Sequence, residues 1–225
     1  MFVLRQGDTN AHESEPEGEG DLNADYVSRT KKFLETYEKT DMGKRVVIVD
    51  GTETEEKYPA FSISELGECG EGNYGYVVEE GAKVEPCIFI KLNTIWGWKP
   101  EPYECDKDDD KDDDICTHIN GQADKDDNIY INCAGRYAAD QEALEGAGLT
   151  YFPESRALPI KYFPYQGKSE GNNYHSPLVA VKISPKGQRA GQLIHIECRA
   201  YYKGVKHVTK TKEGMVMFEL QIKDD

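Results

Sequence analysis

The sequence that decides the fold lies in the last third of the chain, where residues 178–183 read LVAVKI, residues 193–201 read LIHIECRAY and residues 215–222 read MVMFELQI. Apolar side chains recur at every second position, and a period of two places alternate residues on opposite faces of a strand. Because clusters of Pro, Gly and Lys separate these runs, the pattern predicts an antiparallel sheet. Cys198 falls on the apolar side of the middle run, so its sulfur could link that strand to another layer.

Shorter apolar runs upstream are expected to supply the other strands. They read RVVIVDG at 45–51, FSISEL at 61–66, NYGYVVEEG at 73–81, PCIFIKLN at 86–93 and IYINC at 129–133. We expect the first of these to be a buried strand and the third to be a turn followed by a strand. Residues 138–148, AADQEALEGAG, are expected to form a loop.

A single amphipathic helix is predicted near the start of the folded part, between Asp25 as N-cap and Gly43 as stop. One helical face collects Tyr26, Thr30, Phe33, Leu34 and Tyr37. This stripe is suited to lying across a sheet. Together these elements predict a mainly β fold, an immunoglobulin-like antiparallel β-sandwich with one flanking α-helix.

The chain has 225 residues and a formal net charge of -15, and much of that charge is local. Eleven acidic and three basic residues lie between Glu104 and Asp127, so residues 104–128 are expected to form an extended, solvated acidic loop. The Asp runs that start at Asp106 and Asp124 lack the Gly and Glu that a calcium-binding EF-hand loop requires, so no specific metal site is predicted. Acidic proteins repel nucleic acid and anionic lipid, and neither is expected as a partner.

The cysteines indicate a disulfide framework. Six are present, at Cys69, Cys87, Cys105, Cys116, Cys133 and Cys198. Because none forms a CxxC pair and no His stands at zinc-ligand spacing, a metal is the weaker interpretation. A disulfide framework implies an oxidising compartment, and the residues alone leave fifteen pairings open.

The N-terminal part is expected to be a separate segment. Residues 1–22 are polar, rich in Glu and Gly and without periodicity, so we interpret them as a flexible acidic arm ahead of a domain at 23–225. The opening MFVL is too short for a signal peptide or a membrane span, so a membrane would be reached only through an N-terminal anchor absent from this sequence. The five His are dispersed and no catalytic motif is present, so neither enzymatic activity nor a cofactor is expected.

Three blocks of sequence resemble one known family. The first block carries Cys69, Tyr74, Gly75, Tyr76, Gly81, Pro86, Cys87, Lys91, Asn93, Gly97, Lys99 and Pro100. The second reads ALPIKYFPYQGK at 157–168 followed by SPLVAV at 176–181, and the third reads IHIECRAYYKG at 194–204. In this order they are similar to the extracellular domain of the β subunit of the sodium/potassium-transporting ATPase, a P-type pump family that includes the proton/potassium pump.

The resemblance implies a pairing of cysteines. The family pairs cysteines in chain order, which gives Cys69 with Cys87 and Cys133 with Cys198. The second pair would tie the IYINC strand to the IHIEC strand. Cys105 and Cys116 bracket the acidic loop, have no counterpart in the family pattern and most simply pair with each other.

The resemblance also implies a partner and a role. Its aromatic segment corresponds to Tyr162, Phe163, Pro164, Tyr165, Gly167 and Lys168, which would contact the α subunit of the pump; the alternative is an aromatic patch packed on the helix. The implied role is non-catalytic: assembly, delivery and cation-affinity tuning of the α subunit on the extracellular side of the plasma membrane.

A second hypothesis is a secreted, anchorless relative that acts in adhesion or as an acidic cation-binding protein. Trp96 and Trp98 could form a homophilic adhesion surface, or pack half-buried at the end of a strand.

Overall fold

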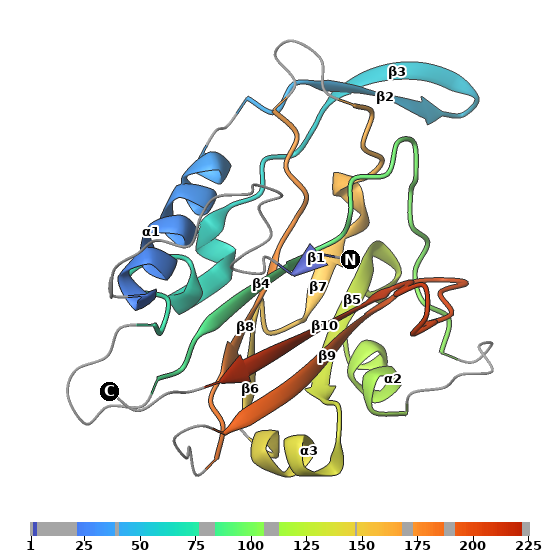
Figure 1. Cartoon of the computed structure of the whole chain (residues 1–225). Coiled ribbons are helices and arrows are strands. Elements are labelled where there is room, and N and C mark those ends of the chain that lie inside the picture. The colour runs from blue at the N-terminus through green and yellow to red at the C-terminus, as the bar shows by residue number, and fades with distance from the viewer. Residues whose placement is uncertain are drawn as a thin grey trace.

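The computed structural model confirms a mainly β sandwich. It describes residues 2–3, 22–38, 41–76, 84–105, 113–146, 148–167, 173–186 and 192–221. Two four-stranded sheets form the body, and a two-stranded hairpin stands apart from them (Figure 1). The strands are β1 (Phe2–Val3), β2 (Lys44–Val49), β3 (Thr52–Lys57), β4 (Cys87–Lys91), β5 (Asn128–Gly135), β6 (Leu149–Phe152), β7 (Ala157–Pro159), β8 (Val179–Ile183), β9 (Leu193–Tyr201) and β10 (Met215–Gln221). The helices are α1 (Leu22–Leu34), α2 (Asp113–Asn120) and α3 (Ala138–Leu144), with 3₁₀ turns η1 (Glu35–Glu38), η2 (Ile63–Cys69), η3 (Lys125–Asp127) and η4 (Ile160–Tyr162).

The strand order divides the chain between the layers. The first sheet has the order β1-β4-β8-β6 and the second the order β10-β9-β5-β7, with antiparallel neighbours throughout. The three C-terminal apolar runs are β8, β9 and β10, as predicted. They do not share one sheet, however, because β8 belongs to the first sheet and the chain then crosses to the second. Such crossings between sheets are usual in sandwiches with Greek-key connections.

The alternating apolar residues fill the space between the sheets. Ile90 and Val179 of the first sheet and Ile131 and Ile196 of the second are fully buried within one cluster. Burying each such side chain contributes about 1.5–3 kcal/mol to folding. The period-two pattern therefore predicts both the strands and the face that each one buries.

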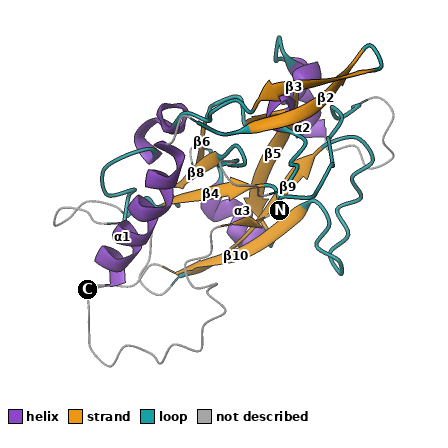
Figure 2. Cartoon of the chain, turned by 90° about the horizontal axis from the view of Figure 1, so that it is seen from above, coloured by secondary structure: helices purple, strands orange, loops and turns teal. Residues whose placement is uncertain are grey.

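Helix α1 covers one flank of the sandwich, as Figures 1 and 2 show. Leu34 is buried, and the ring of Phe33 lies 6.5 Å from the ring of Phe89 on β4. The hydroxyl of Tyr37, in η1, donates a hydrogen bond of 2.9 Å to the carbonyl oxygen of Ser176. The predicted helical stripe thus packs on the first sheet and on the segment that leads into β8.

A second helix, α3, stands where a loop was expected. The carboxylate of Asp140 accepts a hydrogen bond from the backbone N–H of Tyr137 at 3.1 Å, which satisfies a free donor at the start of the helix. Ala143 and Leu144 are buried against the core. Gly135 permits this packing, because a Cβ there would lie 2.3 Å from the backbone of Asp140. The loop prediction is wrong because tertiary packing stabilises a helix too short to form alone.

The acidic segment also contains a helix. Residues 106–112, the densest part of the charge run, lie outside the described residues, but residues 113–120 form α2. Ile115 and Ile119, four residues apart on α2, are buried in a second small core. The expectation of an extended loop over all of 104–128 is therefore wrong, because two apolar residues at helical spacing give this segment a face to bury.

Two further expectations need correction. Residues 61–66 do not form a strand, because Ser62 caps the 3₁₀ turn η2, which begins at Ile63 and is kinked at Gly67, with Leu66 buried before the kink and Cys69 buried after it. The run at 45–51 forms a strand, but β2 is mostly exposed. Within the arm, Phe2–Val3 pair with β4 as strand β1, while residues 4–21 and the predicted strand in 77–81 lie outside the described residues.

The structure contains three disulfides and no free cysteine, and all six cysteines lie in its described part. The pairs are Cys69–Cys87, Cys105–Cys116 and Cys133–Cys198. The last pair joins residues that face each other across neighbouring strands β5 and β9, with Cα atoms 4.0 Å apart. It therefore fastens two strands of one sheet, and the expectation of a link between layers is wrong.

Candidate partner-binding surface

The aromatic segment at 162–168 has a buried beginning. Tyr162 is 2% exposed and Phe163 is 3% exposed. The ring of Tyr162 lies 6.0 Å from that of Phe61, and the ring of Phe163 lies 5.7 Å from that of Trp98. These two side chains therefore anchor the segment in the core, in line with the packing alternative.

The next residues come to the surface. Pro164, Tyr165 and Gly167 are half-buried, while Lys168 lies outside the described residues. The backbone carbonyl of Tyr165 accepts a hydrogen bond of 2.8 Å from the N–H of Gly97. Gly167 has a φ of +88°, and a Cβ at this position would lie 2.8 Å from the ring of Trp96. Only glycine meets both conditions easily, so the Trp96 ring lies over this backbone.

Trp96 and Trp98 have different environments. Trp98 packs its ring against Phe163 and Tyr202 at centroid distances of 5.7 and 5.3 Å. Trp96, in contrast, is 69% exposed. One tryptophan thus supports the segment from below, and the other offers a large apolar ring to solvent.

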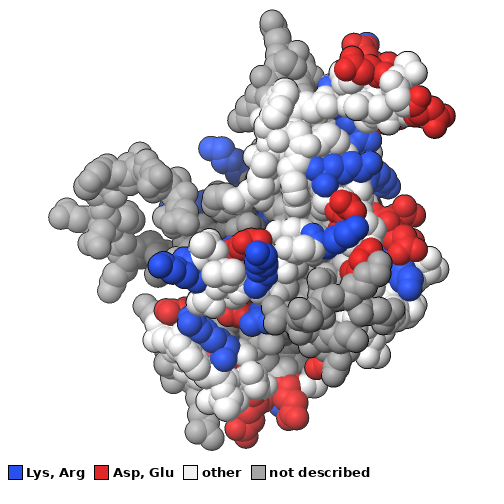
Figure 3. Space-filling view, turned by 90° about the vertical axis from the view of Figure 1, so that its right-hand side faces the viewer, with Lys and Arg blue, Asp and Glu red and all other residues white. Residues whose placement is uncertain are grey.

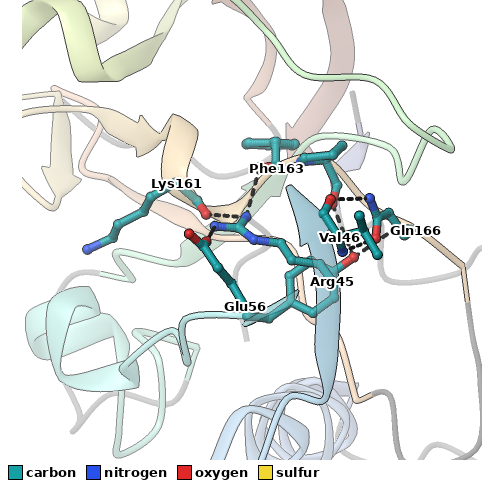
Figure 4. Close-up of polar contacts among 8 residues, drawn as sticks. Arg45, Val46, Glu56, Lys161, Phe163 and Gln166 are labelled. Atoms are coloured by element: carbon teal, nitrogen blue, oxygen red, sulfur yellow. Dashed lines mark hydrogen bonds and ion pairs between the residues drawn. The ribbon is translucent and has the colours of Figure 1, made fainter. Parts of the chain in front are cut away.

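The hairpin β2–β3 holds the same segment from the other side, as Figure 4 shows. The guanidinium of Arg45, a residue only 8% exposed, donates hydrogen bonds of 2.6 and 2.8 Å to the carbonyl oxygens of Lys161 and Phe163. It also makes an ion pair of 3.4 Å with Glu56 on the neighbouring strand. The side chain of Gln166 accepts from the backbone N–H of Val46 and donates to its carbonyl, both at 2.7 Å.

Tyrosines complete the contacts that hold this segment. We call Arg45, Tyr58 and Gln166 together the clamp. The hydroxyl of Tyr58 donates to the carbonyl of Pro164 at 3.1 Å and accepts from the N–H of Gln166 at 2.9 Å. The ring of Tyr174 lies 5.0 Å from that of Tyr58 and 5.2 Å from that of Tyr165. The position of the surface segment is therefore set by the backbone and side chains on both sides of it.

Among the described residues, five of the eight exposed large apolar side chains lie on the hairpin and on the loop that contacts Tyr165. The hairpin contributes three and the loop after β4 contributes two: Val46, Ile48, Val49, Ile95 and Trp96. Ile48, the most exposed, has 75% of its surface in solvent. Figure 3 shows this side of the molecule, with acidic side chains on the projecting hairpin, uncharged residues beside it, and basic and acidic side chains below it. Exposed apolar area of this kind is typical of an interaction surface.

Sequence reasoning identified the aromatic segment but missed the hairpin that holds it. Arg45, Gln166 and the β2–β3 turn were not singled out. A usable signal was present at Asp50 and Gly51, because an Asp-Gly pair between two β-prone runs is a strong hairpin signal. Both residues have positive φ, 49° and 77°, as a type I′ turn requires. The clamp partners have no comparable sequence signal, since they are 120 residues apart along the chain.

The surface has no feature of a metal centre. Among the described residues, no group of three or more His, Cys, Asp or Glu side chains is arranged to hold a metal ion. Within the same residues, no helix is long and apolar enough to cross a bilayer. The arrangement is chemically suited to binding another macromolecule through aromatic and apolar contacts.

The fold defines the class of the chain, a disulfide-bonded, mainly β sandwich domain. The sequence model of the sodium/potassium ATPase beta chain family matches residues 17–218, and the chain belongs to that family. It is 34% identical over 161 residues to sodium/potassium-transporting ATPase subunit beta-1 of Drosophila melanogaster, covering 69% of this chain and 47% of the relative. Subunit beta-2 of the same organism is 38% identical over 158 residues, covering 68% and 45%. Human subunit beta-2 is 28% identical over 217 residues, covering 88% and 63%. The chain thus spans about half the length of the two Drosophila relatives.

The clamp predicts a particular response to alkaline pH. Burial raises the pKa of Tyr162 to about 12, with the nearby Glu65 carboxylate adding to the shift, and burial also raises the pKa of Tyr174 to about 12. A pKa that is higher in the folded state than in the unfolded state means that stability is full below pH 10 and is lost as the pH rises from 10 through 12. As followed by absorbance at 295 nm, we expect a first ionisation step near the ordinary tyrosine value of about pH 10 and a late step that contains Tyr162, Tyr174 and Tyr130, whose pKa burial also raises to about 12.

The control for this titration is Tyr174→Phe, which should remove one hydroxyl from the late step and leave the early step unchanged. Near-ultraviolet circular dichroism should report loss of tertiary structure within the late step. A single ionisation step near pH 10 with an intact near-ultraviolet spectrum would contradict the prediction.

Proposed function

We propose that the chain is the extracellular domain of a β subunit of a sodium/potassium-transporting pump and that it binds the pump's α subunit without taking part in catalysis. The observation that carries the proposal is the clamp of Arg45, Gln166 and Tyr58, which fixes the half-exposed segment Pro164–Gly167 next to Trp96. A surface that is ordered before binding loses less conformational freedom on association. The proposed contacts are therefore Pro164, Tyr165 and Gly167, with Tyr162 and Phe163 as buried supports.

Assembly, delivery to the plasma membrane and tuning of cation affinity would follow from the same contacts. An α subunit that is bound through an apolar surface keeps that surface covered during folding and transport. A β surface that fits one α conformation better than another shifts the equilibrium by the difference in contact free energy. The three disulfides are consistent with an oxidising extracellular location.

Substitutions at the surface test this proposal. The chain, attached to a membrane anchor, is co-expressed with a pump α subunit, and the amount of α subunit that co-purifies is measured. We expect Trp96→Ala and Tyr165→Ala each to reduce the captured α subunit about tenfold or more, because buried aromatic residues dominate interface free energies. The matched control is Tyr137→Ala, since Tyr137 is also an exposed aromatic residue but lies at the start of α3.

Two results would overturn the proposal. One is failure of the unaltered, anchored chain to capture any α subunit, with pump abundance unchanged. The other is full capture of the α subunit by both Trp96→Ala and Tyr165→Ala, which would mean that this surface does not contact it. A dimer of the chain that depends on Trp96, seen by analytical ultracentrifugation, would support homophilic adhesion, the second candidate that the exposure of Trp96 favours.

A further inference from the structure

The hairpin β2–β3 ends in an open strand edge. It forms a separate two-stranded sheet, and it projects from the sandwich in both ribbon views (Figures 1 and 2). All six residues of β3, Thr52–Lys57, are exposed. A two-stranded hairpin is only marginally stable in water, so this one depends on what it contacts on its other side.

The contact with Gln166 shows which backbone groups of the hairpin point outward. Both the N–H and the carbonyl of Val46 bond the Gln166 side chain, so they point away from β3. Val46 is paired with Glu55, and residues facing each other in an antiparallel pair alternate between bonded and non-bonded pairs. The Val46–Glu55 pair is therefore non-bonded, and the N–H and carbonyl of Glu55 point away from β2.

The same alternation extends along β3. Glu53 faces Ile48 and Lys57 faces Lys44, both two positions from the Val46–Glu55 pair, so their backbone groups also point outward. Gly43 and Tyr58 are the next pair beyond Lys44 and Lys57, so the alternation requires them to be a bonded pair. The hydrogen bond of 3.1 Å from the N–H of Tyr58 to the carbonyl of Gly43 fits this register. In the described part of the chain no strand pairs with this edge. It thus offers three outward amides and three outward carbonyls.

The side chains on this face of the hairpin are acidic and apolar along most of its length and basic at its open end, where Lys44 pairs with Lys57. The ammonium of Lys44 makes an exposed ion pair of 2.8 Å with Glu55, which solvent screens. Glu53 and Glu55 share a face of the hairpin with Val46 and Ile48, because paired residues project to the same side of a sheet. Val46 and Ile48 are β-branched and exposed, and they gain burial if a further strand lies beside β3 and its partner covers this face. The charge selects the added strand, since a strand with basic side chains opposite the two glutamates is favoured and an acidic one is opposed.

A second copy of the chain is a poor occupant of the edge. Two β3 strands that pair antiparallel about Thr54 place Glu53 of one copy opposite Glu55 of the other, twice. Pairing about Glu55 brings the two Glu55 side chains opposite each other, although Glu53 then faces Lys57. Like charges directly opposite each other on neighbouring strands are destabilising. A strand with basic side chains opposite both glutamates avoids this repulsion in every register, so it is the better occupant.

We propose that the outer edge of β3 binds an extended segment of the partner as a third strand, with basic side chains alternating along it. This inference rests on the proposed function, since the partner is the subunit that covers the neighbouring Tyr165–Trp96 surface. Strand addition derives its affinity from main-chain hydrogen bonds and its selectivity from alternate side chains. The hairpin and the aromatic segment, joined through Arg45 and Gln166, then act as two adjacent parts of one docking surface.

Binding of short peptides to the whole chain tests whether the outer edge of β3 accepts an added strand. The probe is the blocked peptide TKVKVKT, and its acidic twin TEVEVET is the matched control. We expect the basic peptide to bind at least tenfold more tightly by fluorescence anisotropy. Hydrogen exchange should show the amides of Glu53 and Glu55 exchanging rapidly in the free chain and slowly with the peptide, while that of Thr54, bonded to β2, is protected in both.

Three variants separate the contribution of the backbone amide from that of the side-chain charge. Glu53→Pro removes an outward N–H without removing a bond to β2, since proline is tolerated where the amide of an edge strand faces solvent, and it should weaken binding about tenfold. Glu53→Gln keeps the amide and removes only the charge, so we expect about threefold. Glu142→Gln removes an exposed charge on α3 and should have no effect. Protection of the Thr54 amide in Glu53→Pro verifies that the hairpin is still formed.

The outcomes distinguish this inference from the proposed function. Failure of the basic peptide to bind or to protect the outward amides, with Glu53→Pro capturing as much α subunit as the unaltered chain, would overturn strand addition and leave the proposed function standing. Peptide binding by a chain that captures no α subunit would overturn the proposed function and the assignment of the partner. Dimerisation of the free chain that Glu53→Pro abolishes would overturn the choice of occupant.

Discussion

Replacing both Cys133 and Cys198 with serine is expected to lower the free energy of unfolding by about 4 kcal/mol, since this disulfide closes the longest loop, with a sequence separation of 65. Both sulfurs are buried in the main core, so two hydroxyls would also lose solvation there. For a domain of this size the loss corresponds to a fall in melting temperature of about 8–16 °C. Urea unfolding and scanning calorimetry of the oxidised protein measure both quantities.

The matched control is the double serine variant at Cys105 and Cys116. This pair spans a sequence separation of 11 and borders the small core around α2, so its chain-entropy contribution is at most about 3 kcal/mol. Its loss should first release α2, which hydrogen exchange on that helix would report. A fall of less than about 1 kcal/mol for the Cys133 and Cys198 variant would contradict the view that the covalent pair between β5 and β9 stabilises the second sheet.

The strands of the sandwich could be predicted because their signal is local. In β9, Ile194, Ile196 and Cys198 alternate with half-buried polar residues, and nine residues carry the pattern. The hairpin was located as a strand but wrongly expected to be buried, because alternation in Val46 and Ile48 indicates a pleat and not what covers it. Whether a face is covered depends on residues elsewhere in the chain.

The predictions for helix α3 and turn η2 were wrong for a related reason. Helix α3 is seven residues long and depends on the close approach that Gly135 permits, which no local pattern in Ala138–Leu144 records. Residues 61–66 alternate as a strand would, yet Ile63–Cys69 form the turn η2, which Ser62 caps and Gly67 kinks with a φ of 52°. Short segments satisfy more than one period, and the tertiary contacts decide between them.

In the candidate site, too, the sequence located some residues, whereas the roles of others depend on tertiary contacts. The resemblance located the aromatic segment, but only burial separates Tyr162 and Phe163, which support it, from Tyr165, which reaches the surface. Trp96 was weighed as a surface residue, and its exposure together with the contact over Gly167 places it beside Tyr165. Arg45 could not be singled out, because an arginine in a β-prone run gives no sign that it will be buried.

Arg45→Ala is expected to lower the free energy of unfolding by about 3 kcal/mol, since two charge-assisted hydrogen bonds are lost, one to the buried carbonyl of Phe163 and one to the part-buried carbonyl of Lys161. Arg45→Lys should restore only part of this, because Nη1 of the guanidinium bonds both carbonyls while Nη2 faces Glu56, and a compact ammonium group cannot reach both sites at once. The cation–π contact with Tyr58, at 5.4 Å, would also weaken. Urea unfolding measures the global change, and hydrogen exchange of the β2–β3 amides measures the local one.

Glu56→Gln separates the carbonyl contacts from the ion pair. Glu56 is partly exposed and its oxygen lies 3.4 Å from the guanidinium, so removing its charge should change stability by no more than about 1 kcal/mol. Equal losses in Glu56→Gln and Arg45→Ala would mean that the ion pair, and not the bonds to Lys161 and Phe163, holds the hairpin. If the bonds to the carbonyls dominate, Arg45→Ala should also release the hairpin from the aromatic segment, and both parts of the docking surface would then lose their fixed relative position together.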